Sequence, residues 1–442
     1  MSVGLIAVAE TFEVTMGIDI GTTSVKAVAV DADGDVRART RIPHAVNAPS
    51  PAVLEHDAAE VWNASVVGAC DAVSAEHPVV GIGLAAMVPS LAAVDGDGVP
   101  ISPGILYGDH RGHHPDGEFV GFLRSLEQAV PDAHAYWPAQ AVASAALCGA
   151  AAIDAITAMT CLPVFGADGW DAQWCDPAKL PELAMDSTPV GHRGDAPVAA
   201  GTVDALAEQL VSGADTPGDV LVICGTTLIT WAVCEGWPEA DGLWTIPHLQ
   251  PGLSAIGGPS NAGGLFLERV RAITGDPADD PSHPDRLPLW VPYIRGERTP
   301  RHDPDLRAAL VGLDVGHGPA DVLAAAYEAA GFVVRHHLDV ADATPERIVA
   351  AGGGTHVERW MQALADTTNL PVDVTAVPEG AAKGAAWMAR VSAGLESGDL
   401  AEARRWARTS RRVEPRADWA EAGNRRYPQW RAACDTRSEA AQ

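Results

Sequence analysis

Positively charged residues are scarce in this chain. Its 442 residues include 30 lysines and arginines against 58 aspartates and glutamates, which gives a formal net charge of −28. Only three of the basic residues are lysines, at positions 26, 179 and 383. Nucleic acids and anionic membrane surfaces attract basic proteins, so this balance argues against both as partners. The simplest explanation of the charge is an acidic surface that keeps the protein in solution.

Several sequence signals are also missing. The seven cysteines form no C-x-x-C pair and show no metal-binding spacing with histidine, so we expect reduced thiols in a cytoplasmic protein. No apolar run reaches the roughly 18 residues of a membrane span, and the N-terminus lacks the basic and apolar pattern of a signal peptide. No G-x-x-x-x-G-K-S/T sequence occurs, which excludes a P-loop nucleotide site.

What the chain does contain is typical of a globular protein with a full core. Hydrophobic residues make up 47% and charged residues 20%, and the length suggests two domains. Alternating apolar residues predict strands over 14–20, 25–30, 36–42 and 79–84. Longer periodic segments predict helices over 57–75, 139–159, 320–339 and 381–393, and an arginine-rich helical tail over 401–433. This mixture predicts an α/β layered fold.

The most informative feature is an internal repeat. MGIDIGTTSVKAVAV at residues 16–30 and VLVICGTTLITWAVC at residues 220–234 each read as a strand, a Gly-Thr-Thr turn and a second strand. Backbone N–H groups and threonine hydroxyls in such a turn suit phosphate oxygens. We therefore expect two related halves, each with one phosphate-binding hairpin, formed by Gly21, Thr22 and Thr23 and by Gly225, Thr226 and Thr227.

The two copies differ at one chemically important position, where the first has Asp19 and the second has Ile223. Mg²⁺ usually takes one or two carboxylates together with phosphate oxygens and water. We therefore predict Asp19 as the metal-associated residue, and a solvated turn acid is the alternative. Lys26, on the strand that leaves the turn, is predicted to face phosphate, and a surface lysine is the alternative.

Several further segments resemble, in order, the motifs of the FGGY family of carbohydrate kinases. Residues 289–313, LWVPYIRGERTPRHDPDLRAALVGL, resemble the family's PY-x-x-GERTP stretch and the DP-x-x-R and GL that follow it. Residues 351–366, AGGGTHVERWMQALAD, resemble its adenosine-binding segment, and residues 379–386, EGAAKGAA, its E-x-x-A-x-GAA motif. GTVD at 201–204 resembles the family's aGxxD, and ILYGDHR at 105–111 resembles ILW-x-D-x-R.

The resemblance implies two ribonuclease-H-like domains of the actin/hexokinase type with an interdomain cleft. It also implies transfer of the ATP γ-phosphate to a hydroxyl of a ketose, polyol or sugar acid, with ATP and Mg²⁺ as cofactors and a small-molecule sugar as partner. Such a reaction depends more on positioning and charge neutralisation than on covalent chemistry. We place the domains at 1–198 and 199–442, with Asp204 and the second hairpin in the latter. We expect a hinge near 195–203 and the last helix packed back near it.

The same resemblance implies roles for individual residues. Asp204 is the implied catalytic base, with a helix N-cap as the alternative. The implied adenosine-side residues are Gly352, Gly353 and Gly354, for which a helix-entry turn is the alternative. Asn261 is given a nucleotide-side role, and a helix cap is equally consistent. The expected sugar-binding residues are Asp109, Arg111, Met87, Pro89 and Tyr107, and a surface ion pair is the alternative for Asp109 and Arg111.

The sugar side departs from the family pattern. Xylulose kinases of the family typically have Gln-Met-His-Gly where this chain has Met87-Val88-Pro89-Ser90, so the histidine that would touch a ketose is absent. The usual tryptophan of ILW-x-D-x-R is replaced by Tyr107, and the segment between Arg111 and Asp204 is short for the family. The identity of the sugar is therefore not carried over.

The sequence thus predicts an ATP- and Mg²⁺-dependent sugar kinase, with a pentulose such as xylulose or ribulose as the first choice and a polyol or sugar acid as alternatives. The rival is a catalytically silent regulator that binds sugar or nucleotide. The altered segment 87–90 favours this rival, and the presence of both Asp19 and Asp204 opposes it. An actin- or Hsp70-like ATPase is disfavoured by the GERTP segment. The oligomeric state is left open, a homodimer included.

Overall fold

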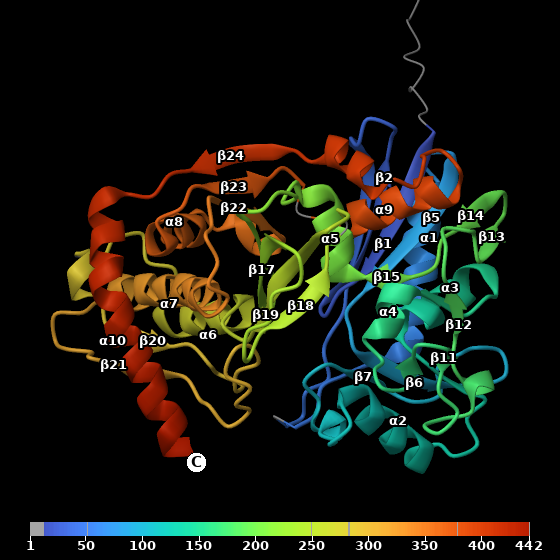
Figure 1. Ribbon diagram of the computed structural model, residues 1–442, viewed down its shortest axis with the longest axis horizontal. Helices are drawn as coiled ribbons and strands as arrows, with labels where there is room; N and C mark the ends of the chain where they lie inside the picture. The colour runs from blue at the N-terminus through green and yellow to red at the C-terminus, as the bar shows by residue number, and fades with distance from the viewer. Residues whose placement is uncertain (1–12, 51, 249, 282, 378, 442) are drawn as a thin grey trace, which may run out of the picture. The chain divides into compact units, whose positions relative to one another are not determined.

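The computed structural model describes residues 13–50, 52–248, 250–281, 283–377 and 379–441 (Figure 1). Contacts divide the chain into two compact units. The first unit runs to Val211 and includes Ala381–Trp406, and the second consists of Ser212–Gly380 and the chain from Ala407 onwards. The chain therefore passes from one unit to the other three times, and each unit is built from separate segments.

This division differs from the expected one in two respects. The segment expected to be a hinge, 195–203, contains β14 (Ala196–Val198) and β15 (Thr202–Val203), and both pair with β5 (Val79–Ala86) inside the first unit. Because α5 (Asp204–Ser212) follows directly, Asp204 belongs to the first unit rather than to the second. The last helix, α10 (Ala417–Ala441), lies in the second unit, and Ala381–Trp406 is the segment that returns to the first.

The main sheet of the first unit has the strand order β13-β14-β5-β1-β2-β3, with β15 beside β5. The remaining bounds are β1 Val14–Ile20, β2 Ser24–Val30, β3 Val36–Pro43 and β13 Gly191–Arg193. The first three strands form the expected antiparallel meander, and β5 runs parallel to β1. Every residue of β1 is buried, as expected for a central strand covered on both faces.

Helix α9 (Gly380–Ser392) packs on this sheet at very short range. A Cβ at Gly17 on β1 would lie 1.7 Å from a carbonyl oxygen of α9, and one at Gly83 on β5 would lie 2.0 Å from another. Helix backbone therefore rests directly on strand backbone. Helix α5 meets α9 in the same way, since a Cβ at Gly384 would lie 1.8 Å from the carbonyl oxygen of Ala207.

The described part of the first unit also holds a second sheet, β4-β7-β6-β8, and the α-helices α1 to α4. The strands are β4 Glu55–His56, β6 Ser90–Val94, β7 Gly104–Leu106 and β8 Ala135–Trp137, with short pairs formed by β9 Ala152–Asp154, β10 Phe165–Gly166, β11 Gly169–Trp170 and β12 Glu182–Ala184. The helices are α1 Ser65–Ser74, α2 Glu118–Ala129, α3 Ala139–Cys148 and α4 Ala155–Met159. The single helix expected over 139–159 is wrong, because Gly149 takes a left-handed φ of 80° that ends α3, and β9 separates α3 from α4.

The main sheet of the second unit repeats this topology. Its order is β18-β19-β17-β16-β22-β23-β24, with bounds Trp244–Pro247, Leu253–Ser260, Leu228–Glu235, Asp219–Cys224, Arg347–Ala351, Val372–Thr375 and Thr409–Val413. In both units an antiparallel meander is followed by two strands parallel to its first strand, as β3-β2-β1-β5-β14 and as β19-β17-β16-β22-β23. The repeat in the sequence is therefore a repeat of the fold.

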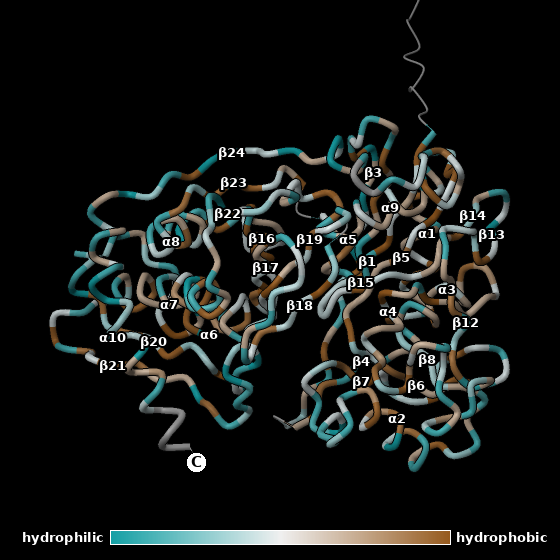
Figure 2. Tube along the Cα trace, viewed as in Figure 1, coloured by the Kyte–Doolittle hydropathy of each residue, from teal (hydrophilic) through white to brown (hydrophobic). Residues whose placement is uncertain are grey.

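Helices α6 (Gly264–Thr274), α7 (Pro319–Val340), α8 (Glu358–Thr368) and α10 complete the second unit, with the hairpin of β20 (Leu289–Val291) and β21 (Ala309–Val311). Its core contains Phe266, Phe332, Trp360 and Trp430. Central β16 is hydrophobic, whereas edge strand β24 is hydrophilic (Figure 2). The tail expected to be helical over 401–433 is thus wrong in part, because β24 interrupts it. No described helix combines the length and apolar character of a membrane span.

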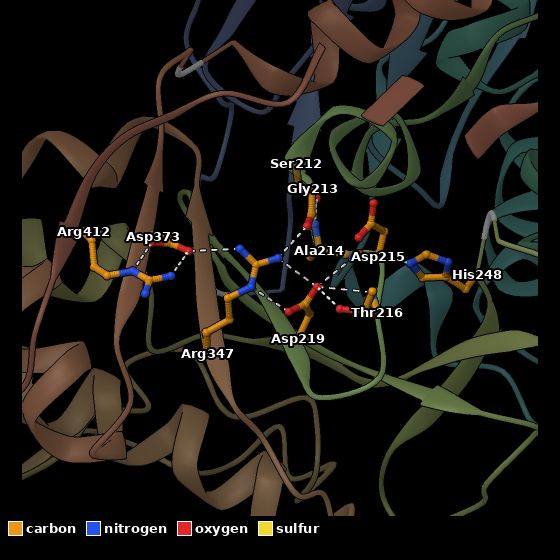
Figure 3. A network of polar contacts seen from close by, with 10 residues as sticks. All are labelled: Ser212, Gly213, Ala214, Asp215, Thr216, Asp219, His248, Arg347, Asp373 and Arg412. Atoms are coloured by element: carbon orange, nitrogen blue, oxygen red, sulfur yellow. Dashed lines mark hydrogen bonds and ion pairs between the residues drawn. The ribbon is translucent and has the colours of Figure 1, made fainter. Parts of the chain in front are cut away.

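A network of two arginines and two aspartates joins four strands of the second sheet (Figure 3). Arg347 Nε donates to Asp219 at 2.7 Å, and its Nη1 donates to Asp373 at 3.0 Å. Asp373 also accepts two hydrogen bonds of 2.7 Å from Arg412 on β24. Arg347 Nη2 further donates to the carbonyl oxygen of Gly213 at 2.9 Å, so the network also fixes the loop that leads into β16.

Candidate active site

The first Gly-Thr-Thr hairpin is tied to two side chains of its own unit. Gly21 N donates to the carbonyl oxygen of Ser24 at 3.1 Å and closes the turn between β1 and β2. The hydroxyl of Thr22 lies 2.9 Å from the hydroxyl of Tyr107, and the carbonyl oxygen of Thr22 accepts a hydrogen bond of 2.9 Å from His56 Nε2. The turn that sequence reasoning assigned to phosphate is therefore held in one conformation.

His56 is a functional candidate that sequence reasoning missed. Its side chain is 1% exposed, and Trp62 Nε1 donates to its Nδ1 at 3.0 Å. Because Nδ1 accepts, the ring proton sits on Nε2, which is the atom that donates to Thr22. Burial lowers the pKa of His56 to about 4, so the ring is neutral at physiological pH. A single histidine on a two-residue strand gives no pattern by which this role could be found.

Asp19 and Lys26 face each other across the first hairpin. They are cross-strand partners in β1 and β2, and Lys26 Nζ lies 3.2 Å from Asp19 Oδ2. Asp19 is 5% exposed, so it is not a solvated turn acid. One buried carboxylate beside a phosphate-type turn fits Mg²⁺, which takes few protein ligands when phosphate oxygens complete its shell. Among the described residues no three His, Cys, Asp or Glu side chains could hold a metal by themselves.

Asp204 opens α5, and a second acid, Glu208, follows one helical turn later. Asp204 Oδ1 accepts a hydrogen bond of 2.7 Å from the backbone N–H of Ala205. Glu208 is 6% exposed, and its burial raises its pKa to about 8. Lys26 opposes this rise in the pKa of Glu208, while Asp19 and Asp204 add to it, so the charges of all three side chains reach Glu208.

Glu208 was not predicted. The i, i+4 spacing of Asp204 and Glu208 was nevertheless readable, because residues four apart share one face of a helix. The backbone N–H of Ala381, at the start of α9, also donates to Glu208. The first unit thus gathers three carboxylates and one lysine near its hairpin.

In the predicted pair, Asp109 is buried and Arg111 is half-buried, with 30% of its side chain exposed. Asp109 is 1% exposed and accepts hydrogen bonds from Leu54 N at 2.7 Å and from Arg111 N, Nε and Nη2 at 2.9, 2.8 and 2.6 Å. Arg111 Nη1 also forms an ion pair of 2.7 Å with Glu55. Burial opposes ionisation of Asp109, but the hydrogen bonds from Arg111 outweigh it and the pKa of Asp109 is lowered. Arg111 is thus held between two carboxylates.

The residues of the altered segment 87–90 differ in burial, since Met87 and Ser90 are buried and the two residues between them are half-buried. Met87 is 3% exposed and packs in the hydrophobic core of the first unit. Pro89 is half-buried, and the hydroxyl of Ser90 accepts a hydrogen bond of 3.1 Å from the backbone N–H of Ala139 at the start of α3. Of the two residues predicted to meet sugar here, only Pro89 has appreciable exposure.

The second Gly-Thr-Thr hairpin rests on the N-terminus of α6. Gly225 N donates to the carbonyl oxygen of Thr227 at 3.0 Å. Gly264 N then donates to the carbonyl oxygen of Gly225 at 2.8 Å, and Leu265 N to that of Thr226 at 3.1 Å. The first N–H groups of a helix have no partner within the helix, and here the hairpin supplies it.

Asn261 does not cap α6, whose N-cap residue is Gly263. The side-chain amide of Asn261 donates instead to the carbonyl oxygen of Gly296 at 3.0 Å, and its backbone N–H donates to Glu297 at 3.1 Å. The GERTP segment and the segment before α6, far apart in sequence, are therefore joined. Glu297 lay within a quoted motif, but sequence reasoning gave it no role.

Two of the three predicted adenosine-side glycines are required by the chain's own packing. Gly352 has a left-handed φ of 85°, and a Cβ there would lie 3.0 Å from the carbonyl oxygen of Cys224. A Cβ at Gly354 would lie 2.2 Å from the ring of Trp360. Gly353 is exposed and has open space around it. A helical turn follows at Gly353–His356, so the helix-entry reading also describes this segment.

Comparison with known proteins decides the family. Residues 14–115 match the N-terminal domain, and residues 230–393 the C-terminal domain, of the FGGY family of carbohydrate kinases. The chain belongs to this family. It is therefore a carbohydrate kinase, a phosphotransferase with an alcohol group as acceptor. Sugar kinases of this family use ATP, generally with Mg²⁺.

Three relatives illustrate the FGGY kinases that the chain is similar to. It is 25% identical to the xylulose kinase of Escherichia coli (strain K12), over 86% of this chain and 90% of the relative. It is 24% identical to the gluconokinase of Bacillus subtilis (strain 168), over 84% and 86%. The crystal structure of the xylulose kinase from Rhodospirillum rubrum superposes with a TM-score of 0.76 at 25% identity, covering 96% of this chain and 99% of the other. The two-domain actin/hexokinase-type fold is thereby confirmed.

Proposed function

We propose that this kinase phosphorylates a hydroxyl of a neutral ketose, with a pentulose such as xylulose or ribulose as the substrate. The observation that carries the proposal is the cluster of Asp19, Lys26, Asp204 and Glu208 in the first unit, in which Lys26 pairs with Asp19 and the other three charges act on Glu208. Such a cluster is more than a sensor needs, because simple binding requires no base. Similarity to a xylulose kinase over 86% of the chain supports the choice of sugar.

The chemistry assigns a proton to Asp204. The sugar oxygen forms a bond to the γ-phosphorus while the bond from that phosphorus to the β,γ-bridging oxygen breaks, and the hydroxyl proton must leave. Asp204 is the proposed acceptor of that proton. Asp19 would hold Mg²⁺, which when bound offsets charge on the phosphates. Lys26 would add positive charge at the same end of the hairpin.

Glu208 has a supporting part in this arrangement. With a pKa raised to about 8, its carboxyl group is mostly protonated at neutral pH. The charges of the cluster are then the two negative charges of Asp19 and Asp204 and the positive charge of Lys26. Glu208, being protonated, adds no third negative charge. A less negative cluster repels the phosphates of ATP less strongly.

The surroundings of Arg111 favour a neutral sugar over a sugar acid. Asp109 and Glu55 both contact its guanidinium, so the group of three carries a net negative charge. A carboxylate-bearing substrate would meet repulsion here, whereas hydroxyl groups can accept from the remaining N–H groups of Arg111. Tyr107 and Pro89 are the proposed neighbours on the sugar side, and Asp109 acts chiefly by holding Arg111.

The second unit is proposed to bind the nucleotide. Gly225, Thr226 and Thr227 offer backbone N–H groups and hydroxyls to phosphate. Gly353 is the position where a ligand can approach the backbone closely, because nothing fills the space of its missing Cβ. Asn261 is proposed to act through the loop that it joins.

A sugar panel tests the proposal. The purified chain would be given ATP, Mg²⁺ and, one at a time, xylulose, ribulose, glycerol and gluconate, with ADP formation as the readout. A pentulose should give the highest kcat/KM and gluconate a much lower one. Turnover that is fastest with gluconate would contradict the neutral-ketose assignment. Nucleotide binding without turnover on any of the sugars would favour the silent regulator instead.

A further inference from the structure

The second hairpin is supported by a chain of contacts that begins at a buried acid, Glu297. This side chain is 4% exposed. Its Oε2 accepts a hydrogen bond of 2.7 Å from the hydroxyl of Ser260, and its Oε1 accepts from Asn261 N at 3.1 Å and Arg298 N at 2.6 Å. One carboxylate thereby fixes the end of β19 and the first residue after it.

The contacts continue from this point into α6. The hydroxyl of Ser260 accepts from Ala262 N at 3.1 Å, and Gly263 is the N-cap residue of α6. Only Asn261 and Ala262 separate Ser260 from Gly263, and the backbone N–H groups of both are hydrogen-bonded. We therefore expect the position of Glu297 to set where α6 begins.

The start of α6 in turn sets the hairpin. Two of its backbone N–H groups, from Gly264 and Leu265, donate to the hairpin carbonyls. A Cβ at Gly263 would lie 2.3 Å from the carbonyl carbon of Thr227, and one at Gly264 would lie 2.7 Å from the oxygen of Gly225. The fit between helix and hairpin is backbone on backbone, so a displacement of α6 must displace the hairpin as well.

We propose that Glu297 is a positioning residue for nucleotide phosphate, which acts by holding Ser260 and Asn261 and, through the first turn of α6, the hairpin Gly225–Thr226–Thr227. The inference rests on the proposed nucleotide-binding role of the second unit. It deepens that role, because it names the group that keeps the phosphate-facing backbone in place. Glu297 itself is not proposed to touch ATP.

Two substitutions separate position from charge. Glu297→Asp keeps the negative charge but withdraws the carboxylate by one methylene from Ser260 and Asn261. Glu297→Gln keeps the length, but it places an amide N–H group against the hydroxyl of Ser260, which already accepts from Ala262. If Glu297 positions the hairpin, both variants should weaken phosphate binding. If its charge alone mattered, removing it should strengthen phosphate binding and the aspartate should change nothing.

Glu328 supplies a matched control in the same unit. It is a buried glutamate of similar exposure, 7%, and Arg426 binds it at 2.8 Å. Arg426 also donates to the carbonyl oxygens of Leu287 and Pro288, so Glu328 stabilises a different part of the unit. Glu328→Gln should lower the melting temperature without a selective effect on phosphate.

The experiment compares calorimetric affinities for MgADP and for adenosine on the full chain. We expect both Glu297 variants to bind MgADP about tenfold more weakly while adenosine affinity stays within error, a change worth about 1.4 kcal/mol. Glu328→Gln should keep the wild-type ratio. An unchanged ratio in folded Glu297 variants overturns the positioning role and leaves the proposed function intact. Failure of the wild-type chain to bind MgADP overturns both.

A measurement on the wild-type chain covers the case in which the variants do not fold. MgADP should slow hydrogen exchange at the amides of Gly264 and Leu265, because phosphate on the hairpin stabilises the carbonyls that these amides bond. Adenosine, which lacks phosphate, should not do so. Equal responses to the two ligands, or no response to MgADP, would overturn the link between α6 and the hairpin.

Discussion

The two Gly-Thr-Thr hairpins share a sequence and a place in the fold, yet they are built differently. In the first, Ile20 pairs with Val25, whereas in the second Cys224 pairs with Leu228. The second turn is therefore one residue tighter than the first. Because side chains alternate along a strand, a shift of one residue changes which side chains face each other across the hairpin.

This shift separates the chemistry of the two copies. The first register places Lys26 opposite Asp19, while in the second Ile223 lies opposite Ile229. The first hairpin is supported by hydrogen bonds with the side chains of His56 and Tyr107. The second is supported by the backbone N–H groups of α6. Duplicated folds can thus divide a reaction, with proton and metal chemistry proposed for one copy and phosphate binding for the other.

The sharpest test of this division is Asp204→Asn. Loss of the proposed base should lower kcat by on the order of 10³-fold, since general-base catalysis typically contributes 10²–10⁴-fold. MgADP affinity should change little, because the nucleotide is assigned to the second unit. Steady-state kinetics and calorimetry measure the two quantities. Asp168→Asn, at an exposed position of the first unit, is the control. A variant that retains turnover would show that Asp204 is not the base.

The next test makes the first hairpin resemble the second. Gly17 of β1 corresponds to Leu221 of β16, and Leu221 packs in a cluster with Trp231 and Val349. Gly17→Leu should cost about 3 kcal/mol or more, because overpacking a dense core forces the backbone to move and α9 leaves no room. Urea unfolding measures the loss. A truncation at the equivalent position, Leu221→Ala, should cost about 2–5 kcal/mol because it leaves a cavity. A Gly17→Leu chain of wild-type stability would contradict the close packing of α9.

Acid should weaken the first hairpin through His56. Its pKa is about 4 when folded, against an ordinary value of 6.5. Between these two pKa values the unfolded chain binds a proton at His56 that the folded chain does not. The contribution of neutral His56 to the free energy of unfolding is therefore fully present above pH 6.5 and is lost as the pH falls towards 4. The loss is on the order of 3 kcal/mol at most.

The contribution of His56 to this pH dependence has to be isolated with a variant. The reason is that burial also lowers the pKa of His337, in the second unit, to about 4. His56→Gln should flatten part of the decline in unfolding free energy between pH 6.5 and 4, measured by urea unfolding at a series of pH values. A decline of the same size in the variant would show that His56 does not contribute.

The smallest effect is expected from Tyr107→Phe. The change removes the hydroxyl that contacts Thr22 and should cost about 1 kcal/mol, the usual worth of one hydrogen bond. Tyr136→Phe is the matched control, since its hydroxyl donates to Val130 at 3.1 Å away from the hairpin. Both variants should lose a similar amount of stability in thermal unfolding. Only Tyr107→Phe should raise the KM for the sugar. Equal KM values would remove Tyr107 from the site.

Sequence reasoning reached the features that are local. The strand–turn–strand repeat is confirmed by the two hairpins, and Asp19 and Asp204 could be proposed as site residues because each follows a readable pattern. His56 and Glu297 could not be assigned in the same way, since what distinguishes them is burial and partners that are distant in the sequence. Glu208 shares a helix face with Asp204 by its i, i+4 spacing, but its burial is not visible in the sequence. The boundary between units was missed for the same reason, because β15 joins the first unit only through its pairing with β5.

The extended helix expected over 139–159 illustrates a different limit. Its alanine-rich composition favours a helix throughout, whereas the single glycine at 149 ends α3. The left-handed backbone at this position would be strained for an alanine but is not for a glycine. This one residue therefore decides where α3 ends. Composition predicts the kind of element more reliably than its length.

The return of residues 381–406 to the first unit has a consequence during synthesis. A ribosome delivers β1 and β5 early, but the helix that covers Gly17 and Gly83 is made only after all of residues 212–380 have been translated. The first unit therefore cannot be completed before the main part of the second has emerged. Although nascent domains generally fold from the N-terminal end, here the N-terminal unit is finished late.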